Sequence, residues 1–232
     1  MNACFVTSSG TGIGKTVVMC SLIRALRANG VTVRAVKPVA TGYSPDTVAD
    51  SDTGRILAAL GLAPDLENIN AVSPWRFDAP LSPHMAASRE GRALDVAEIV
   101  SFCRTNETGE GVLLVEGIGG VMVPLTERET VADLMAALGY PALVVVGSYL
   151  GTLSHTLTAA AALAARHIEI AAVIVSESEQ SPVTLAETTE TLARFLAPVP
   201  VLSLPRAGGD GDRCRVAELA RLLRASTAPN CL

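Results

Sequence analysis

A glycine-rich stretch near the N-terminus, residues 5–16 (FVTSSGTGIGKT), constrains the fold of this chain more than any other segment. An apolar run typical of a β-strand leads into a turn of small residues. The turn ends in Gly14-Lys15-Thr16, where an amphipathic helical pattern begins. A strand, a glycine-rich turn and a helix in this order form the usual layout of a phosphate-binding loop. The segment therefore predicts an α/β fold with a nucleotide site beside its first strand.

The residues of this loop suit the binding of a polyphosphate. Gly10, Gly12 and Gly14 lack a Cβ, so the backbone can present successive N–H groups to phosphate oxygens. The helix N-terminus adds unpaired N–H groups and the positive end of the helix dipole. Lys15 is expected to reach the terminal phosphates, and the Thr16 hydroxyl is expected to bind a Mg²⁺ ion. The predicted nucleotide-binding residues of this segment are Gly10, Thr11, Gly12, Ile13, Gly14, Lys15, Thr16 and Val17.

The loop departs from the usual spacing, because the first glycine of the pattern G-x-x-x-x-G-K-[ST] falls at Ser9. The tripeptide Gly-Lys-Thr is common by chance, and the alternative is a glycine-rich turn with a surface lysine. The position of the stretch, between an N-terminal strand and a helix, favours the nucleotide site.

The rest of the chain alternates aliphatic strands with helical patterns. With 232 residues, of which 49% are hydrophobic, it is long enough for one large domain with a substantial core. Aromatic residues make up only 3%, and small aliphatic side chains suit helices packed closely on a parallel sheet. We therefore predict a single α/β domain over residues 1–232, similar to P-loop nucleoside triphosphatases, with a mostly parallel sheet and helices on both faces.

Two charged residues stand at the ends of predicted strands, which form the edge of an open α/β sheet where ligands bind. Lys37 follows the strand 31–36 and precedes Pro38, which cannot continue the ladder. A lone lysine at such a place is more often simply solvated. Glu116 ends the buried strand 112–115, where P-loop enzymes hold Mg²⁺ or its water. Paired with the phosphate-binding loop, Glu116 becomes a candidate metal ligand, whereas the position of Lys37 alone does not decide its role.

Three acidic residues, Asp46, Asp50 and Asp52, lie ahead of a helical pattern that ends near Leu60. They either cap this helix and complement its dipole, or one of them binds a metal. Residues 64–83 are rich in proline and asparagine and predict a long ordered loop that walls a substrate site.

Composition argues against several classes of protein. A formal net charge of −5 without a lysine-rich patch argues against a nucleic-acid-binding surface. Five cysteines without C-x-x-C or Cys/His spacing are expected to be reduced thiols. No apolar stretch approaches the ~20 residues of a membrane-spanning helix, and a strand begins almost at the first residue, which leaves no room for an export signal. We therefore expect a cytoplasmic protein that binds small ligands and neither nucleic acid nor a membrane.

Four stretches of the chain resemble the dethiobiotin synthetases of the biotin pathway, and the resemblance covers nearly the whole sequence. They are residues 11–16 of the loop, residues 37–42 (KPVATG), residues 115–120 (VEGIGG) and residues 150–155 (LGTLSH). Residues 80–91 and the pair Ser51-Asp52 also resemble the family. Each stretch is weak alone, but their order and spacing together are specific.

The resemblance implies an ATP-dependent ring closure of 7,8-diaminononanoate with CO₂ to dethiobiotin, ADP and phosphate. One substrate amine captures CO₂, present with bicarbonate, as a carbamate. The γ-phosphate is transferred to the carbamate oxygen, and the second amine attacks the resulting mixed anhydride. Such chemistry needs positioning and charge neutralisation above all. The implied catalytic residues are Lys37, Lys15 and Thr11, and the implied Mg²⁺ ligands are Thr16, Asp52 and Glu116.

The same resemblance implies a homodimer with composite sites. Lys37 and Thr41 are expected to bind the reacting end of the substrate. The substrate carboxylate is expected at the helix start from Gly151 to Ser154 of a partner subunit, where the helix dipole favours an anion.

The nucleotide base is expected beside Ser176 and Pro205. The family usually has asparagine where this chain has Ser154 and Ser176, and Gly-Thr where it has Ser8-Ser9. A hydroxyl has fewer hydrogen-bonding groups and a shorter reach than an amide. We therefore expect Ser154 to weaken binding of the substrate carboxylate and Ser176 to allow loose selection among nucleotide bases. Ser8-Ser9 is expected to tighten the turn at the start of the loop.

The alternative function is that of a P-loop switch ATPase of the partitioning or septum-positioning kind. Those proteins carry a signature lysine early in the loop, where this chain has Gly10. Their membrane-targeting members end in a basic amphipathic helix, and the helix predicted at about 213–225 faintly resembles one. Packing of that helix on the sheet edge explains the same pattern. A glutamine-dependent amidotransferase of the cobyric acid synthase type shares the loop, but no length remains for a glutaminase domain.

Overall fold

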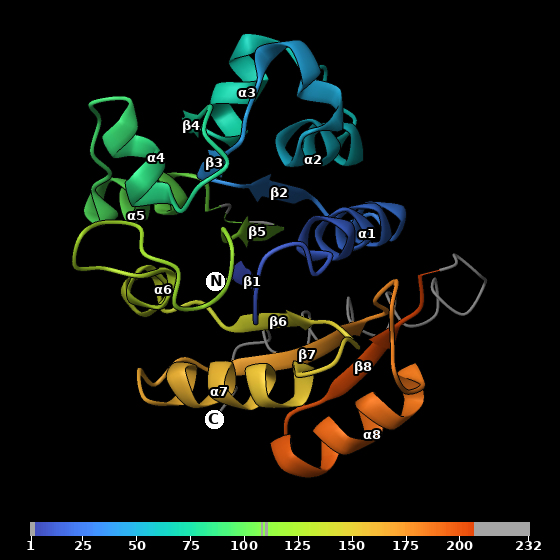
Figure 1. Ribbon diagram of the computed structural model, residues 1–232. Coiled ribbons are helices and arrows are strands. Elements are labelled where there is room, and N and C mark those ends of the chain that lie inside the picture. The colour runs from blue at the N-terminus through green and yellow to red at the C-terminus, as the bar shows by residue number, and fades with distance from the viewer. Residues whose placement is uncertain (1–2, 108, 110, 207–232) are drawn as a thin grey trace, which may run out of the picture.

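Six parallel strands form the central sheet of the computed structural model, which describes residues 3–107, 109 and 111–206. The strands of this sheet are β1 (Ala3–Ser8), β2 (Val33–Val36), β5 (Val112–Glu116), β6 (Ala142–Val146), β7 (Ile170–Ser176) and β8 (Val201–Leu204). Their order across the sheet is β2-β5-β1-β6-β7-β8 (Figure 1). The first strand thus lies inside the sheet, and the strand order reverses on either side of it. In open α/β sheets such a reversal marks the ligand-binding edge.

Helices connect the strands, and a small second sheet lies beside them. The α-helices are α1 (Lys15–Ala28), α2 (Asp52–Leu60), α3 (Leu66–Val72), α4 (Pro83–Arg89), α5 (Val96–Thr105), α6 (Val131–Leu138), α7 (Thr152–Ala164) and α8 (Leu185–Leu196). A 3₁₀ helix, η1, spans Pro45–Asp50. The strands β3 (Val39–Thr41) and β4 (Trp75–Phe77) pair in parallel as a two-stranded sheet. The small sheet holds the chain that follows Lys37 at the carboxyl edge of β2.

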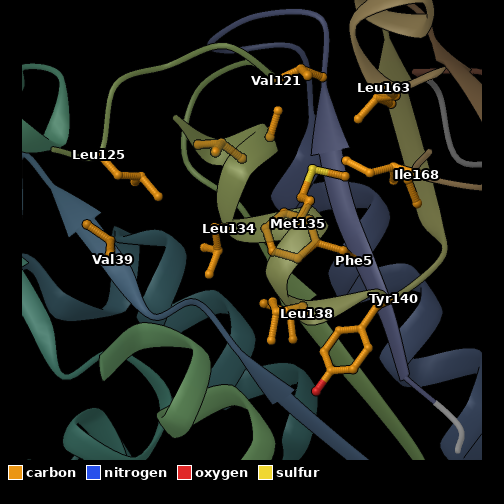
Figure 2. Packing of buried hydrophobic residues seen from close by; sticks show 14 of the residues in the cluster. Phe5, Val39, Val121, Leu125, Leu134, Met135, Leu138, Tyr140, Leu163 and Ile168 are labelled. Atoms are coloured by element: carbon orange, nitrogen blue, oxygen red, sulfur yellow. The ribbon is translucent and has the colours of Figure 1, made fainter. Parts of the chain in front are cut away.

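Helices cover both faces of the large sheet, as the sequence predicts. Because successive side chains of a strand point to opposite faces, Val6 packs in one core and Phe5 in the other. Buried residues of α1, α2 and α3 join the core that contains Val6. Buried residues of α5, α6 and α7 join the core that contains Phe5. Figure 2 shows Phe5 among the side chains of Leu134, Met135 and Leu138.

Several boundaries differ from the sequence-based expectation. The interpretation of 64–83 as one long loop is wrong, because α3 and β4 lie within it. The helical pattern that ends near Leu60 is confirmed as α2, and the acids Asp46 and Asp50 that precede it lie in the separate helix η1. The helix predicted at about 213–225 lies outside the described residues.

Cys4, Cys20 and Cys103 are buried free cysteines, and the remaining two cysteines lie outside the described part of the chain. None of the described helices has both the length and the apolar character that crossing a bilayer requires.

Candidate active site

The loop between β1 and α1 has the backbone of an anion-binding helix start. Gly14, the residue before α1, has φ 96° and ψ 17°, a left-handed conformation that favours glycine. A Cβ on Gly14 would lie only 2.8 Å from the Oγ of Ser176, so both the dihedral angle and the space require glycine here. Among the described residues no side chain caps the first turn of α1. Its N–H groups therefore remain available for a phosphate.

Lys15 begins α1 and its side chain is held by the loop itself. The side-chain Nζ lies 3.1 Å from the Oγ of Ser8 and 3.4 Å from the carbonyl oxygen of Gly10. The residue is only 7% exposed. Burial, and after it the nearby positive charge of Lys37, together lower the pKa of Lys15 to about 8. With this lowered pKa, the side chain of Lys15 is mostly protonated at neutral pH and loses its charge as the pH rises above about 8.

A second lysine lies in a compact cluster with two carboxylates. The Nζ of Lys37 lies 2.6 Å from Oε1 of Glu116 and 2.8 Å from Oδ2 of Asp52. The Thr16 hydroxyl donates to the same Oε1 of Glu116 over 2.8 Å. Glu116 and Lys37 are buried, whereas the side chain of Asp52 is 44% exposed. The cluster therefore has a closed side at Glu116 and an open side at Asp52.

Strand register brings Lys37 and Glu116 together. β2 and β5 are parallel neighbours in which Val36 is aligned with Val115. Lys37 and Glu116 directly follow these two aligned residues, so they lie side by side at the same edge of the sheet. The backbone N–H of Lys37 donates to the carbonyl of Val72 over 2.9 Å, which fixes the chain beyond the end of β2.

Asp52 reaches the cluster because α2 begins beside it. The N-cap Ser51 accepts a hydrogen bond from the backbone N–H of Gly54 over 3.1 Å. A Cβ on Gly54 would lie 1.9 Å from the carbonyl oxygen of Val48, so only glycine lets α2 pack this closely on η1. The sequence left three acids open as candidates, and the structure places Asp52 against Lys37.

The charges of the cluster support one another. Burial by itself lowers the pKa of Lys37, but the carboxylates of Glu116 and Asp52 outweigh it and raise the pKa above its usual value. Burial likewise raises the pKa of Asp52, but the ammonium of Lys37 outweighs this and holds the pKa below its usual range. At neutral pH the lysine is therefore a cation and Asp52 an anion.

The donor set of the cluster fits a hard divalent cation. Carboxylate and hydroxyl oxygens are the protein ligands that Mg²⁺ prefers. The second oxygen of Glu116, Oε2, is buried and has no hydrogen-bonding partner, so this carboxylate has an unused acceptor. Within the described residues there is no group of three or more His, Cys, Asp or Glu side chains that could hold a metal by themselves. Substrate oxygens and water would have to complete the coordination of an ion here, as is usual for Mg²⁺.

The cluster and the loop face a common cavity of about 490 Å³. Predicted site residues that line this cavity are Thr11, Gly12, Ile13, Gly14, Lys15, Thr16, Val17, Lys37, Thr41 and Asp52. Glu116 lies behind them, in contact with Thr16 and Lys37. Asp50, one of the three acids that the sequence left open, also lines the cavity. Residues that line it without having been predicted are Ala40, Gly42, Tyr43, Ser51, Thr53, Arg55, Ile118 and Gly119. Most of these are neighbours in sequence of predicted residues, which is the signal that would have identified them.

Ser8 is the residue whose contact with the site the sequence interpretation missed. Its hydroxyl accepts from Lys15, donates to the carbonyl of Gly10 and also lies 2.9 Å from the carbonyl oxygen of Gly119. The sequence identifies Ser8 only as a departure that tightens the turn. Its contacts with Gly10 and Lys15 are local, whereas its contact with Gly119, 111 positions away along the chain, is made only on folding.

The remaining predicted residues lie outside this cavity. Gly10 lies in the same loop, packed against Gly120. Ser176 ends β7 beside Gly14, and Pro205 follows Leu204 of β8, the partner of Ser176 in the sheet. These two residues therefore occupy neighbouring strand ends next to the loop.

The start of α7 repeats the backbone of the start of α1. Gly151 has φ 98° and precedes α7, whose first turn has no side-chain cap among the described residues. Ser154 is exposed in that turn, and Leu150 just before it is 85% exposed. The Ser148 and Ser178 hydroxyls accept from each other's backbone N–H groups, which ties this loop to the end of β7. Gly151 and Ser154 thus stand apart from the cluster around Lys37.

Comparison with known proteins places this geometry in a family. The AAA domain family matches residues 2–206. The ATP-dependent dethiobiotin synthetase of Caulobacter sp. (strain K31) is 47% identical over 232 residues, covering 99% of this chain and 97% of the relative. The chain belongs to the dethiobiotin synthetase family. The synthetase of Acidiphilium cryptum, 48% identical over 202 residues, covers 86% of this chain and 91% of its own.

Solved structures share the family's fold at much lower identity. The septum site-determining protein MinD from Pyrococcus horikoshii, solved with Mg-ADP, has a TM-score of 0.60 and 15% identity, covering 98% of this chain and 99% of its own. The MinC:MinD complex of Aquifex aeolicus gives 0.60 and 13%, covering 99% of this chain and 98% of that chain. Identities this low show the fold alone. They confirm the predicted P-loop α/β class.

Proposed function

We propose that this protein is an ATP-dependent dethiobiotin synthetase that closes the ureido ring of dethiobiotin on 7,8-diaminononanoate. The observation that carries the proposal is the meeting of Lys15, Lys37 and the Thr16–Glu116–Asp52 oxygens around one cavity. Membership in the family, at 47% identity over nearly the whole chain, supports it.

The loop residues from Gly10 to Val17 bind the polyphosphate of ATP in this proposal. The free N–H groups at the start of α1 and the ammonium of Lys15 face the phosphates. Thr16, Asp52 and Glu116 hold Mg²⁺, which supplies neutralisation of the phosphate charge when bound. Ser176 lies beside Gly14 of the loop, and Pro205 follows the neighbouring strand end, and the base is assigned to these two residues.

The reaction then needs only groups of the substrates for its covalent steps. One amine of the diamine adds to CO₂, loses a proton and becomes a carbamate. A carbamate oxygen attacks the γ-phosphorus as the bond to ADP breaks, which gives a carbamic–phosphoric anhydride. The second amine attacks the carbamate carbon, phosphate leaves, and loss of a proton completes the cyclic urea. Lys37 and Thr41, both at the cavity, bind the anionic carbamate, and Thr11 binds near the transferred group.

The proposal includes a homodimer in which each site takes the carboxylate of its substrate from the start of α7 in a partner. The N–H of Thr152 donates to the carbonyl of Tyr149, but the next N–H groups of this turn have no side-chain cap, and with the exposed Ser154 they suit an anion. The exposed side chain of Leu150 next to them suits a surface that a partner covers.

The test is direct. Purified protein incubated with ATP, Mg²⁺, bicarbonate and 7,8-diaminononanoate should form dethiobiotin, ADP and phosphate in equal amounts, as measured by mass spectrometry and phosphate release. A preparation that hydrolyses ATP at the same rate with and without the diamine, and forms no dethiobiotin, would contradict the proposed function.

A further inference from the structure

The ammonium of Lys37 occupies the position expected for the metal. It contacts Oε1 of Glu116 at 2.6 Å and Oδ2 of Asp52 at 2.8 Å. These carboxylates, with Thr16, are the groups that the proposed function assigns to Mg²⁺. The lysine is 4% exposed, so its charge is balanced by these two carboxylates rather than by water.

A divalent ion and this ammonium would bind the same carboxylates. Oε1 of Glu116 accepts from both Lys37 and Thr16, whereas its Oε2 is free, and Lys37 also contacts Oδ2 of Asp52. Mg²⁺ binds oxygen at about 2.0–2.1 Å, so an ion on Oε1 would lie within ~5 Å of the Lys37 nitrogen, and an ion on Oε2 would lie within ~7 Å of it. Two cations at that distance in a buried site repel each other strongly, because little water screens them.

The cavity next to Lys37 provides space for its displaced side chain. Its side chain lines the cavity of about 490 Å³ together with Lys15 and Thr41. Rotation of a long, flexible lysine stem toward that cavity keeps the ammonium near anions once a polyphosphate is present. The backbone need not move, since the N–H of Lys37 stays hydrogen-bonded to Val72.

We propose that Lys37 serves as an internal cation of the metal site and that Mg²⁺ arriving with the nucleotide displaces it into the cavity. This rests on the proposed function for the identity of the metal and of the anions in the cavity. Displacement makes the charge of Lys37 available to the γ-phosphate and carbamate only when the metal is in place. Metal binding and release of the catalytic lysine are then one event. The Lys37 ammonium hinders metal binding at the carboxylates before the nucleotide arrives, and the bound metal prevents the ammonium from returning.

The test measures metal affinity without substrate or turnover. Binding of Mn²⁺ in the absence of nucleotide is followed by electron paramagnetic resonance for the parent protein and for Lys37→Gln. Removal of the ammonium leaves both carboxylates to the metal, so we expect at least ~10-fold tighter binding by the variant.

Two variants separate displacement from a general charge effect. Lys15→Gln removes a neighbouring positive charge that bonds to Ser8 and Gly10 instead of the carboxylates, and should tighten Mn²⁺ binding less than about threefold. Lys37→Arg keeps a cation in place and should give no gain. Equal Mn²⁺ affinity in the parent and Lys37→Gln, an equal gain in Lys15→Gln, or no detectable binding by Lys37→Gln would each overturn the proposal.

A second measurement uses the parent protein alone. A crystal structure with Mg²⁺ and a non-hydrolysable ATP analogue should show the Lys37 nitrogen beyond hydrogen-bonding distance of Glu116. Retention of both ion pairs beside a bound metal would overturn the proposal even if Lys37→Gln does not fold. Neither measurement involves the diamine, so either can fail while dethiobiotin formation is observed, and the reverse.

Discussion

The starts of α1 and α7 have the same backbone and very different surroundings. Both follow a left-handed glycine, Gly14 with φ 96° and Gly151 with φ 98°, and neither first turn has a side-chain cap among the described residues. At α1 two buried lysines and two carboxylates lie within reach of the helix start. The first turn of α7 has no acidic residue, its one titratable side chain is that of the exposed His155, and it borders the exposed Leu150.

Two helix starts with the same backbone can therefore differ in the charges that pack around them, and these charges are the basis for proposing catalysis at α1 alone. Backbone N–H groups attract an anion at either place. Only the start of α1 has the buried charges that a developing phosphoryl transition state needs. The start of α7 suits an anion that is bound and left unchanged, such as a carboxylate.

Among the variants that test this difference between the two helix starts, removal of the Lys37 charge should cause the largest loss of activity. Lys37→Gln is expected to lower kcat by roughly 10²–10³, because one preorganised contact to the reacting groups is lost. Affinity for ATP measured without a divalent metal should change little, since the phosphate loop is intact and Lys37 then lies on the carboxylates. Steady-state kinetics and nucleotide binding measure the two quantities. The control is Arg34→Gln, which removes an exposed positive charge from the same strand and should act as the parent does. Parental turnover in Lys37→Gln would refute the role.

The two carboxylates should differ in their effect on the metal requirement. Glu116→Gln changes a fully buried carboxylate, the proposed ligand that water cannot replace, whereas the side chain of Asp52 is 44% exposed. We expect the Mg²⁺ concentration for half-maximal rate to rise about 10–100-fold in Glu116→Gln, the range seen when even an outer partner of a metal ligand is lost. Asp52→Asn should raise it less. Asp46→Asn, at an exposed acid of η1, is the control. An unchanged metal requirement in both variants would rule out this site.

The pH dependence of nucleotide capture should come from Lys15. Its pKa of about 8 means that the ammonium is charged below this pH and is lost as the pH rises through it. Since kcat/KM reports the free enzyme, kcat/KM for ATP should fall about tenfold per pH unit above 8. Bound phosphates favour the charged form, so kcat should hold to higher pH.

The variant Lys15→Arg provides the control for this profile. Its guanidinium stays charged over the whole range. The fall of kcat/KM near pH 8 should therefore disappear, whatever the absolute rate. The same fall in Lys15→Arg would assign the titration to another group.

Hybrid dimers test whether the start of α7 serves the site of a neighbour. Ser154→Asp places a negative charge where the substrate carboxylate is expected. Mixed in equal amounts with Lys37→Gln subunits, it should restore about a quarter of the parental activity, because half the dimers are hybrids with one intact site of two. A mixture of Lys37→Gln with Lys15→Gln should restore none, since both changes affect the same half of the site. A fully active monomer by light scattering would contradict the arrangement.

The smallest effect is expected for selection of the nucleotide base. Ser176 offers one hydroxyl beside Gly14, and a hydroxyl supplies less discrimination than an amide. CTP and GTP should therefore compete with ATP at concentrations not far above its own, and Ser176→Ala should change the preference little. Competition kinetics that give a preference for ATP above ~100-fold, or about 2.7 kcal/mol, would mean that other groups read adenine.

Local backbone demands explain why the sequence predicted so much of this site. Gly14 needs a left-handed conformation, and Lys37 and Glu116 sit where aliphatic strands end, so each leaves a pattern in consecutive residues. The choice among Asp46, Asp50 and Asp52 left no such pattern, because helix caps and metal ligands use the same residue type.

Short elements and contacts made only on folding could not be predicted in the same way. α3 has seven residues and β4 has three, too few for a periodicity to stand out from a proline-rich stretch. The hydroxyl of Ser8 gains its contact with Gly119 only when β1 and β5 pair.

The position of β1 in the sheet also determines how much of the chain must be synthesised before the phosphate-binding loop can fold. The strand made first pairs with β5 and β6, which end at Glu116 and Val146. At about 5–20 residues per second, a ribosome needs on the order of ten seconds to supply those neighbours. Until then β1 lacks its neighbouring strands, so the phosphate-binding loop is not supported by a sheet and the apolar side chains of β1 remain exposed. Nascent chains stalled before residue 112 should therefore be cleaved readily within β1 by a protease, and chains stalled well beyond residue 146 should resist.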